Sequence, residues 1–266
     1  MSQLVAIASG KGGVGKTFLA ASLAHALARR GRRVLLFDAD LGLANLDVQL
    51  GIQAEHDLAS VLGGRVALAQ AVFHHAATGT DLIVGRSGSG LLAGLGEPQL
   101  ERLTAALRRL CRRYAYAFLD LSAGLEGACR WFARAADQVL VITSDEPTAL
   151  TDAYAFIKVA CRERDAVQIV VNGVEEVARG IETYQALSEV CRRFLGRDFP
   201  LLGVVRRDRR VAAAIRSQLP FLARYPTSPA AADIERLARR FEETGRDAPV
   251  RRKSPAAAKA STTNPG

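Results

Sequence analysis

The sequence predicts an α/β fold in which helices cover both faces of a mostly parallel sheet. Short, continuous apolar runs alternate with helical patterns along the 266-residue chain. Continuous apolar strands separated by helices are typical of parallel sheets that are buried on both faces. A glycine-rich loop between the first apolar run and the first helical pattern supports the same fold class.

The elements follow in order along the chain. Runs suited to buried strands cover residues 3–9, 33–37, 81–84, 115–119, 138–143, 167–171 and 201–205. Helical patterns lie between them, near residues 16–30, 97–114, 126–136, 148–163, 180–195, 208–217 and 229–243. The pattern over 97–114 places leucines on one side and arginines on the other, which predicts an amphipathic helix. We expect the last helix to pack into the core.

Length and composition predict one domain over residues 1–245, followed by a basic tail over 246–266. The tail is rich in Pro, Ala, Ser, Thr and Lys, so we expect it to be disordered. No apolar stretch is long enough to span a bilayer, and no leader pattern precedes the first strand. Widely spaced cysteines predict reduced thiols in a cytoplasmic protein; they are Cys111, Cys129, Cys161 and Cys191.

The loop over residues 10–17 reads Gly-Lys-Gly-Gly-Val-Gly-Lys-Thr and fits the phosphate-binding pattern of Gly, four residues, Gly-Lys-Thr. A backbone that curls around a phosphate needs glycines, and its N–H groups then point inward. The expected cradle consists of Gly10, Gly12, Gly13, Val14 and Gly15. Lys16 is expected to reach the β- and γ-phosphates, and the Thr17 hydroxyl to ligate Mg²⁺.

Lysine usage singles out the same loop. The chain has 36 Lys plus Arg, of which five are Lys, and its net charge is +9. In the first 250 residues the lysines are Lys11, Lys16 and Lys158. A compact ammonium suits a tight phosphate cradle better than a planar guanidinium does. The arginine excess has two interpretations: solvated helix faces, or contact with an acidic partner, anionic lipid or DNA.

Polar residues at strand ends complete the predicted site. Asp38 and Asp40 follow the second strand, and Asp120 ends an apolar strand further along. In open α/β sheets ligands bind at the carboxyl ends of strands, where carboxylates can hold hydrated Mg²⁺ and orient water. The alternative role for the first pair is turn formation or helix capping. Gly124 is expected to present a backbone N–H to the γ-phosphate. Asn172 is a candidate for adenine contact, although an Asn-Gly pair also forms turns.

These residues together resemble the deviant-Walker ATPases of the MinD/ParA class, because the loop carries Lys11 as well as Lys16. The resemblance covers residues 3 to about 243. Residues 38–47 and 145–158 are similar to the FlhG/FleN (YlxH) branch, which controls flagellar number and placement.

The resemblance implies a role for each matching residue. Lys11 would reach the partner's phosphates across an ATP-bound homodimer, and Asp40 would orient the hydrolytic water. Asp38 and Asp120 would lie in the outer shell of Mg²⁺, while Asn172 would contact adenine. The chain would then be a slow ATPase whose nucleotide state decides which partner it engages.

The implied partners are an FlhF-like GTPase, a flagellar transcription activator or a basal-body protein. The basic residues 251–253 predict weak contact with an anionic membrane surface, so we expect peripheral attachment to the inner face of the cell membrane at most. The chain departs from the family pattern at several positions: Phe18 replaces a hydroxyl residue, Arg206 replaces a proline, and residues 120–124 read Asp-Leu-Ser-Ala-Gly. Alternatives are a ParA-type DNA-partitioning ATPase, a MinD-type division-site ATPase and a catalytically weak scaffold.

Overall fold

A computed structural model describes residues 2–40, 46–85, 95–125 and 127–247. Its centre is an eight-stranded sheet with the order β3-β4-β2-β5-β1-β6-β7-β8. Every pairing is parallel except that of β3 with β4, so the predicted fold class is confirmed. The strands are β1 (Gln3–Ser9), β2 (Val34–Ala39), β3 (Phe73–His75), β4 (Thr80–Ile83), β5 (Tyr116–Ala123), β6 (Gln138–Thr143), β7 (Val167–Val174) and β8 (Leu201–Arg206).

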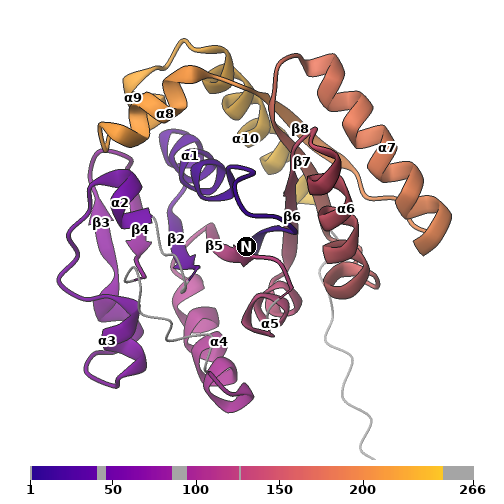
Figure 1. Ribbon diagram of the computed structural model, residues 1–266. Helices are drawn as coiled ribbons and strands as arrows, with labels where there is room; N and C mark the ends of the chain where they lie inside the picture. The colour runs from indigo at the N-terminus through magenta and orange to yellow at the C-terminus, as the bar shows by residue number, and fades with distance from the viewer. Residues whose placement is uncertain (1, 41–45, 86–94, 126, 248–266) are drawn as a thin grey trace, which may run out of the picture.

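Helices cover both faces of this sheet (Figure 1). One face carries α1 (Lys16–Arg29), α2 (Leu46–Leu50), α8 (Arg209–Arg216), α9 (Phe221–Arg224) and α10 (Pro229–Asp247). The other face carries α3 (Leu58–Leu62), the 3₁₀ turn η1 (Leu68–Ala71), α4 (Glu97–Cys111), α5 (Gly127–Ala135), α6 (Pro147–Phe156), its π-helical continuation η2 (Ile157–Cys161) and α7 (Val177–Leu195).

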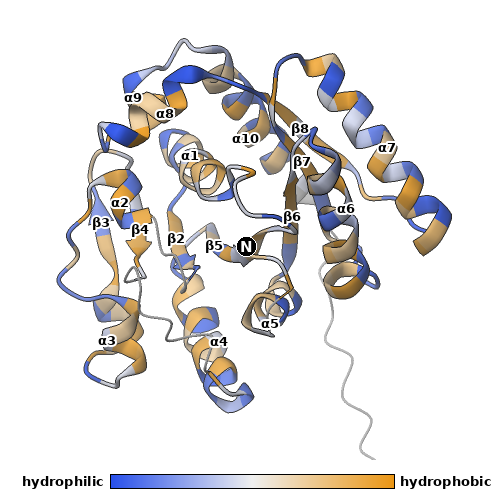
Figure 2. Cartoon of the chain, in the orientation of Figure 1, coloured by the Kyte–Doolittle hydropathy of each residue, from blue (hydrophilic) through white to orange (hydrophobic). Residues whose placement is uncertain are grey.

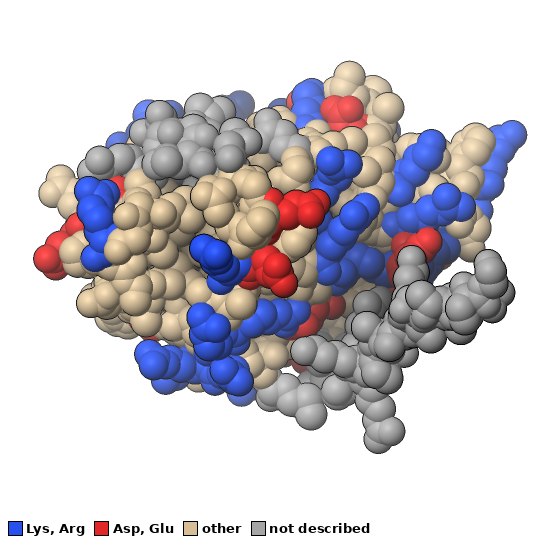
Figure 3. Space-filling view, turned by 90° about the horizontal axis from the view of Figure 1, so that it is seen from below, with Lys and Arg blue, Asp and Glu red and all other residues tan. Residues whose placement is uncertain are grey.

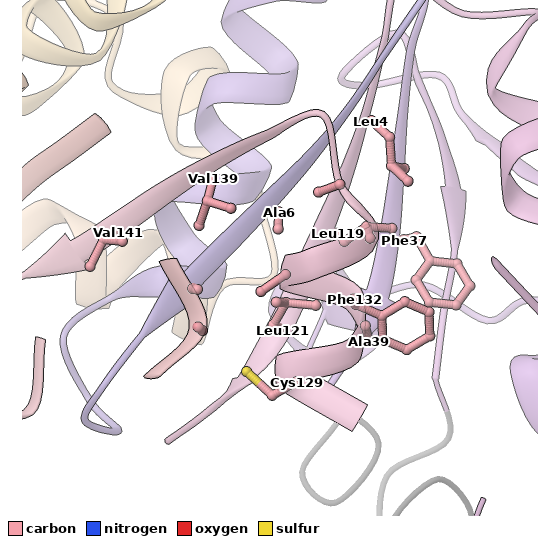
Figure 4. Packing of buried hydrophobic residues seen from close by; sticks show 14 of the residues in the cluster. Leu4, Ala6, Phe37, Ala39, Leu119, Leu121, Cys129, Phe132, Val139 and Val141 are labelled. Carbon is pink, nitrogen blue, oxygen red and sulfur yellow. The ribbon is translucent and has the colours of Figure 1, made fainter. Parts of the chain in front are cut away.

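Two apolar layers fill the space between the sheet and these helices. On the α5 side, Phe37 and Leu119 from neighbouring strands point toward Phe132, which is buried (Figure 4). On the α1 side the last helix contributes Ile234, Leu237, Ala238 and Phe241, none more than 2% exposed. The expectation that this helix belongs to the core is therefore confirmed. Figure 2 shows the same organisation, with hydrophobic strands inside and hydrophilic residues on the outward helix faces.

The structure adds elements that the sequence patterns did not predict. They are short: α2, α3, η1, α9 and the edge strand β3 have five residues or fewer. The helix expected over 148–163 also changes character, because α6 continues as a π-helix from Ile157. Periodicity over fewer than six residues carries too little signal to separate such elements from loops.

Several surface arginines have structural roles. The Arg164 guanidinium donates to the carbonyl oxygens of Arg134 and Ala136, at 2.8 and 2.6 Å, at the C-terminal end of α5. Arg108 donates to the Asp137 carboxylate at 2.7 Å and to the Ala135 carbonyl. Figure 3, which views the face covered by α4 and α5, shows basic side chains in separate groups with acidic and uncharged residues between them. Part of the arginine excess therefore stabilises helix ends.

Candidate functional site

The glycine-rich loop lies between the end of β1 and the start of α1, as the sequence predicts. Gly13 and Gly15 have φ values of 82° and 84°, which disfavour residues that carry a Cβ. At Gly10 a Cβ would collide with the backbone of Asp152 in α6. The loop thus has a curled conformation that requires glycine at positions 10, 13 and 15. Helix α1 begins directly after it, so the N-terminal end of that helix faces the loop.

Asn172, at the end of β7, braces this loop. Its side-chain nitrogen donates to the Val14 carbonyl oxygen at 2.7 Å, and a Cβ at Gly15 would collide with that same nitrogen. The sequence predicted an adenine contact for Asn172. The structure gives its amide nitrogen a second role, because it fixes the backbone that would surround the phosphates.

The loop lysine Lys16 is buried and bonded to an acidic partner. Its Nζ lies 2.7 Å from Oδ1 of Asp120, and the two side chains are 7% and 1% exposed. Oδ2 of Asp120 is also buried, yet it has no hydrogen-bond partner among the described residues. A buried carboxylate oxygen without a donor is costly, so a group that would satisfy it is expected to bind here.

Asp38 lies beside Asp120, because the two residues are register partners on neighbouring strands β2 and β5. Burial, and then the negative charge of Asp120, raise the pKa of Asp38 to about 8. Its oxygens accept bonds from the backbone N–H groups of Asp40, at 3.1 Å, and Leu46, at 3.3 Å. Two carboxyl groups this close form a site that favours a divalent cation or its water ligands.

The second loop lysine, Lys11, points to the turn that begins α6. Its Nζ lies 2.5 Å from Oε2 of Glu146 and 2.8 Å from the Thr148 hydroxyl. The hydrogen bond and charge of Lys11 lower the pKa of Glu146. The sequence patterns did not predict either acceptor as a site residue. Both lie in the Glu-Pro-Thr run of residues 146–148, which is part of the segment that resembles the FlhG/FleN branch.

Gly124 follows β5 on the same side of the sheet. Its backbone N–H donates to the Ser9 carbonyl oxygen at 3.0 Å, and its φ is 89°. Contact of this N–H with a γ-phosphate stays a prediction, and it would require the bond to Ser9 to open. Residues 41–45 of the resembling segment 38–47 lie outside the described residues. The predicted loop, aspartates and Asn172 do converge at one edge of the sheet.

The residues present fit a nucleotide with a hydrated metal ion. A curled glycine loop, the Lys16 ammonium and the unsatisfied Asp120 oxygen offer complementary groups to phosphate oxygens and to metal-bound water. The described residues contain no group of three or more His, Cys, Asp or Glu side chains able to hold a metal alone. Phosphate oxygens, water and the Thr17 hydroxyl are the ligands that the sequence predicts for Mg²⁺.

The departures from the family pattern at Phe18 and Arg206 have structural explanations. The ring of Phe18 packs edge-to-face on Phe221 of α9, with centroids 5.2 Å apart. The Arg206 guanidinium and its backbone N–H both donate to the buried Asp233 carboxylate, which joins β8 to α10. Phe18 thus joins α9 to α1, Arg206 joins α10 to the sheet, and neither residue lies in the phosphate loop.

The helices give no sign of a membrane span: within the described ranges, none is both long and apolar enough to cross a bilayer.

Comparison with known proteins gives consistent matches. The model of the CobQ/CobB/MinD/ParA nucleotide binding domain matches residues 5–221. The antiactivator FleN of Pseudomonas aeruginosa is 35% identical over 242 residues, which cover 90% of this chain and 86% of FleN. The flagellum site-determining protein YlxH of Helicobacter pylori is 34% identical over 191 residues, 72% of this chain and 65% of YlxH.

Solved structures agree with this grouping. The cell division ATPase MinD of Pyrococcus furiosus superposes with a TM-score of 0.79 at 26% identity, covering 92% of this chain and all of MinD. MinD of Pyrococcus horikoshii, solved in complex with Mg-ADP, gives the same TM-score and identity and covers 92% of this chain and 98% of that protein.

Proposed function

The chain belongs to the CobQ/CobB/MinD/ParA nucleotide-binding family, and we propose that it is an ATP-hydrolysing switch that dimerises with ATP and controls flagellar number or placement through partner proteins. The observation that carries this proposal is that the loop holds two lysines in different environments. Lys16 is buried on Asp120, whereas Lys11 is 36% exposed at the mouth of the loop. One lysine suits its own nucleotide, and the other is accessible to a second subunit.

The residues would share the work of hydrolysis as follows. Lys16 leaves Asp120 for the β- and γ-phosphates, and the loop N–H groups hold the triphosphate. Mg²⁺, when bound, neutralises charge that develops on the phosphate oxygens. Asp40 orients a water whose oxygen bonds to the γ-phosphorus while the bond to the β–γ bridging oxygen breaks, giving ADP and phosphate. Asp38 and Asp120 would lie in the outer shell of the metal and accept hydrogen bonds from water bound to it.

Lys11 would act between subunits. In the described monomer its Nζ is held by Glu146 and Thr148, both on the exposed start of α6. An exposed ion pair contributes little stability because water screens it, so Lys11 can exchange Glu146 for a phosphate of the opposing nucleotide at small cost. The γ-phosphate of ATP would thereby supply the negative charge that holds Lys11 of the opposing subunit, and ADP lacks this group.

The solution mass of the Asp40→Ala variant tests this switch. We expect a monomer without nucleotide and with ADP, and a dimer with ATP, because binding persists while hydrolysis stops. Adding Lys11→Ala in the same background should abolish the dimer and leave ATP binding. A mass that ATP leaves unchanged, with ATP binding confirmed, would contradict the switch and favour the scaffold or DNA-binding alternatives.

A surface suited to a protein partner lies where α6 meets α7, at the outer edge of the molecule (Figure 1). Phe194 is 63% exposed and its ring contacts Tyr154 of α6, while Val190, one helical turn before Phe194, is 36% exposed. We call Tyr154, Val190 and Phe194 the α6–α7 patch. The Arg193 guanidinium lies over the Phe194 ring, and Lys158, one turn after Tyr154, is an exposed cation.

The α6–α7 patch supports one class of occupant: an acidic segment with an apolar anchor, supplied by a flagellar transcription activator. Exposed apolar surface with a basic rim is typical of an interaction site. Phe194→Ala should weaken binding of the purified activator by about ten-fold or more, as expected for an aromatic anchor. ATP turnover should not change. Ile181→Ala, an exposed apolar residue elsewhere on α7, is the control; equal loss in both variants would exclude the patch.

A further inference from the structure

Gln218, in the turn between α8 and α9, has a backbone conformation that is unusual for its residue type. Its φ is 54°, and it is the sole non-glycine residue with positive φ in the ranges that the structure describes. A Cβ makes this left-handed region unfavourable for residues other than Gly, Asn and Asp. Such strain persists where surrounding contacts hold it, and it points to a function for the residue.

The Gln218 side chain reaches across to α2. Its Nε2 donates to the Val48 carbonyl oxygen at 3.0 Å. Gly51, directly after α2, packs closely on the same side chain, since a Cβ at this glycine would lie 3.0 Å from the Cβ of Gln218. The turn conformation of Gln218 therefore places its side-chain amide at the Val48 carbonyl of α2 and its Cβ against Gly51, at the end of that helix.

The helix that Gln218 holds is connected to the candidate metal site. The backbone N–H of Leu46, the first residue of α2, donates to Oδ2 of Asp38 at 3.3 Å. α2 has five residues, of which Leu46 and Leu50 are buried. A helix this short is not stable by itself, so its position depends on contacts with its neighbours.

The turn that carries Gln218 is itself firmly attached. The backbone N–H groups of Gln218 and Leu219 donate to Ile215 and Ala214 of α8. Two residues further on, Phe221 is buried against Phe18, in the helix that begins at the phosphate loop. α8 and α9 thus form a platform that is fixed to α1, and Gln218 extends from that platform to α2.

We infer that Gln218 is a positioning residue of the nucleotide site, acting through α2 to hold the Asp38 carboxylate in place. The series of contacts is continuous: Gln218 amide to Val48 carbonyl, along α2 to the Leu46 N–H, and from there to Asp38. Gln218 itself touches no reacting group. The inference rests on the proposed ATPase function, because the position of Asp38 matters for turnover only if the site hydrolyses ATP.

The variant Gln218→Asn separates the hydrogen bond from the strain. Asparagine tolerates positive φ, yet its side chain is one methylene too short to reach Val48 in the same way. We expect kcat for ATP to fall about five-fold, the effect of one lost hydrogen bond on the site geometry. The KM for ATP and the melting temperature should stay at parental values. Gln53→Asn, the same change at an exposed position soon after α2, is the control and should match the parent.

Hydrogen exchange at the Leu46 amide, measured without nucleotide, gives a second readout. We expect faster exchange in Gln218→Asn than in the parent and in Gln53→Asn, because α2 is released. Parental kcat together with parental Leu46 exchange would overturn the inference, as would a fall in kcat matched by equal falls in ATP affinity and melting temperature. If the parent does not hydrolyse ATP at all, the proposed function fails, and the exchange measurement still decides whether Gln218 holds α2.

Discussion

Replacing the buried Asp38 by asparagine should change how the stability of the nucleotide-free protein depends on pH. Burial and the neighbouring Asp120 raise the pKa of Asp38 from 3.8 to about 8, so the folded protein keeps a proton that the unfolded chain releases above about pH 4. The free energy of unfolding from this group is therefore highest below pH 4 and falls as the pH rises toward 8. Between pH 5 and pH 7 the loss amounts to roughly 3 kcal/mol, because one retained proton costs about 1.4 kcal/mol per pH unit.

Asp38→Asn removes this titration and keeps a side-chain oxygen of the same shape. Urea unfolding at pH 5, 6 and 7 without nucleotide should show the parent losing roughly 3 kcal/mol more than the variant across that range. Asp47→Asn, a carboxylate in the adjacent α2, is the control and should keep the parental pH dependence. If the parent and Asp38→Asn lose the same stability from pH 5 to pH 7, the raised pKa and the charge coupling to Asp120 are both refuted.

Further predictions concern the loop. Lys16→Ala should abolish ATP binding and lower the free energy of unfolding by roughly 3–5 kcal/mol, because it leaves the Asp120 carboxylate buried without its partner. Adding Asp120→Asn should restore the stability but not the binding; urea unfolding and ATP titration of both variants measure the two effects. Gly15→Ala should lower ATP affinity by more than about ten-fold, because it strains a φ of 84° and displaces the Asn172 amide from Val14. Its control is Gly64→Ala, with a φ of 70° in open space, which carries the strain alone.

The long elements and the loop could be predicted from sequence because their signals are local. A strand such as β6 is apolar throughout, and the loop needs glycine at fixed positions, so neither depends on distant residues. The convergence of Asp38 and Asp120 was also predictable, since parallel strands bring their carboxyl ends to one edge.

The contacts of the two lysines could not be predicted from the sequence in the same way. Lys11 meets Glu146, which is 135 residues away, and Lys16 meets Asp120 at a separation of 104. No period or spacing encodes such pairs; they arise because β1 lies between β5 and β6 in the sheet. The positive φ of Gln218 was equally hidden, because that position does not carry the glycine or asparagine that marks such turns.

The ion pair between Lys16 and Asp120 sets the terms on which a nucleotide can bind. The Lys16 ammonium cannot make its closest ion pair with Asp120 and with a phosphate at the same time. A phosphate must therefore draw the ammonium away from a buried carboxylate. That carboxylate, with Asp38 beside it, would then be left charged in a place that penalises charge. We expect a divalent cation that arrives with the phosphate to compensate for both losses, because its water would donate to the Asp120 oxygen that has no partner among the described residues. The arrangement would then favour the metal-bound nucleotide over the nucleotide alone, while the ion pair keeps the resting site close to neutral.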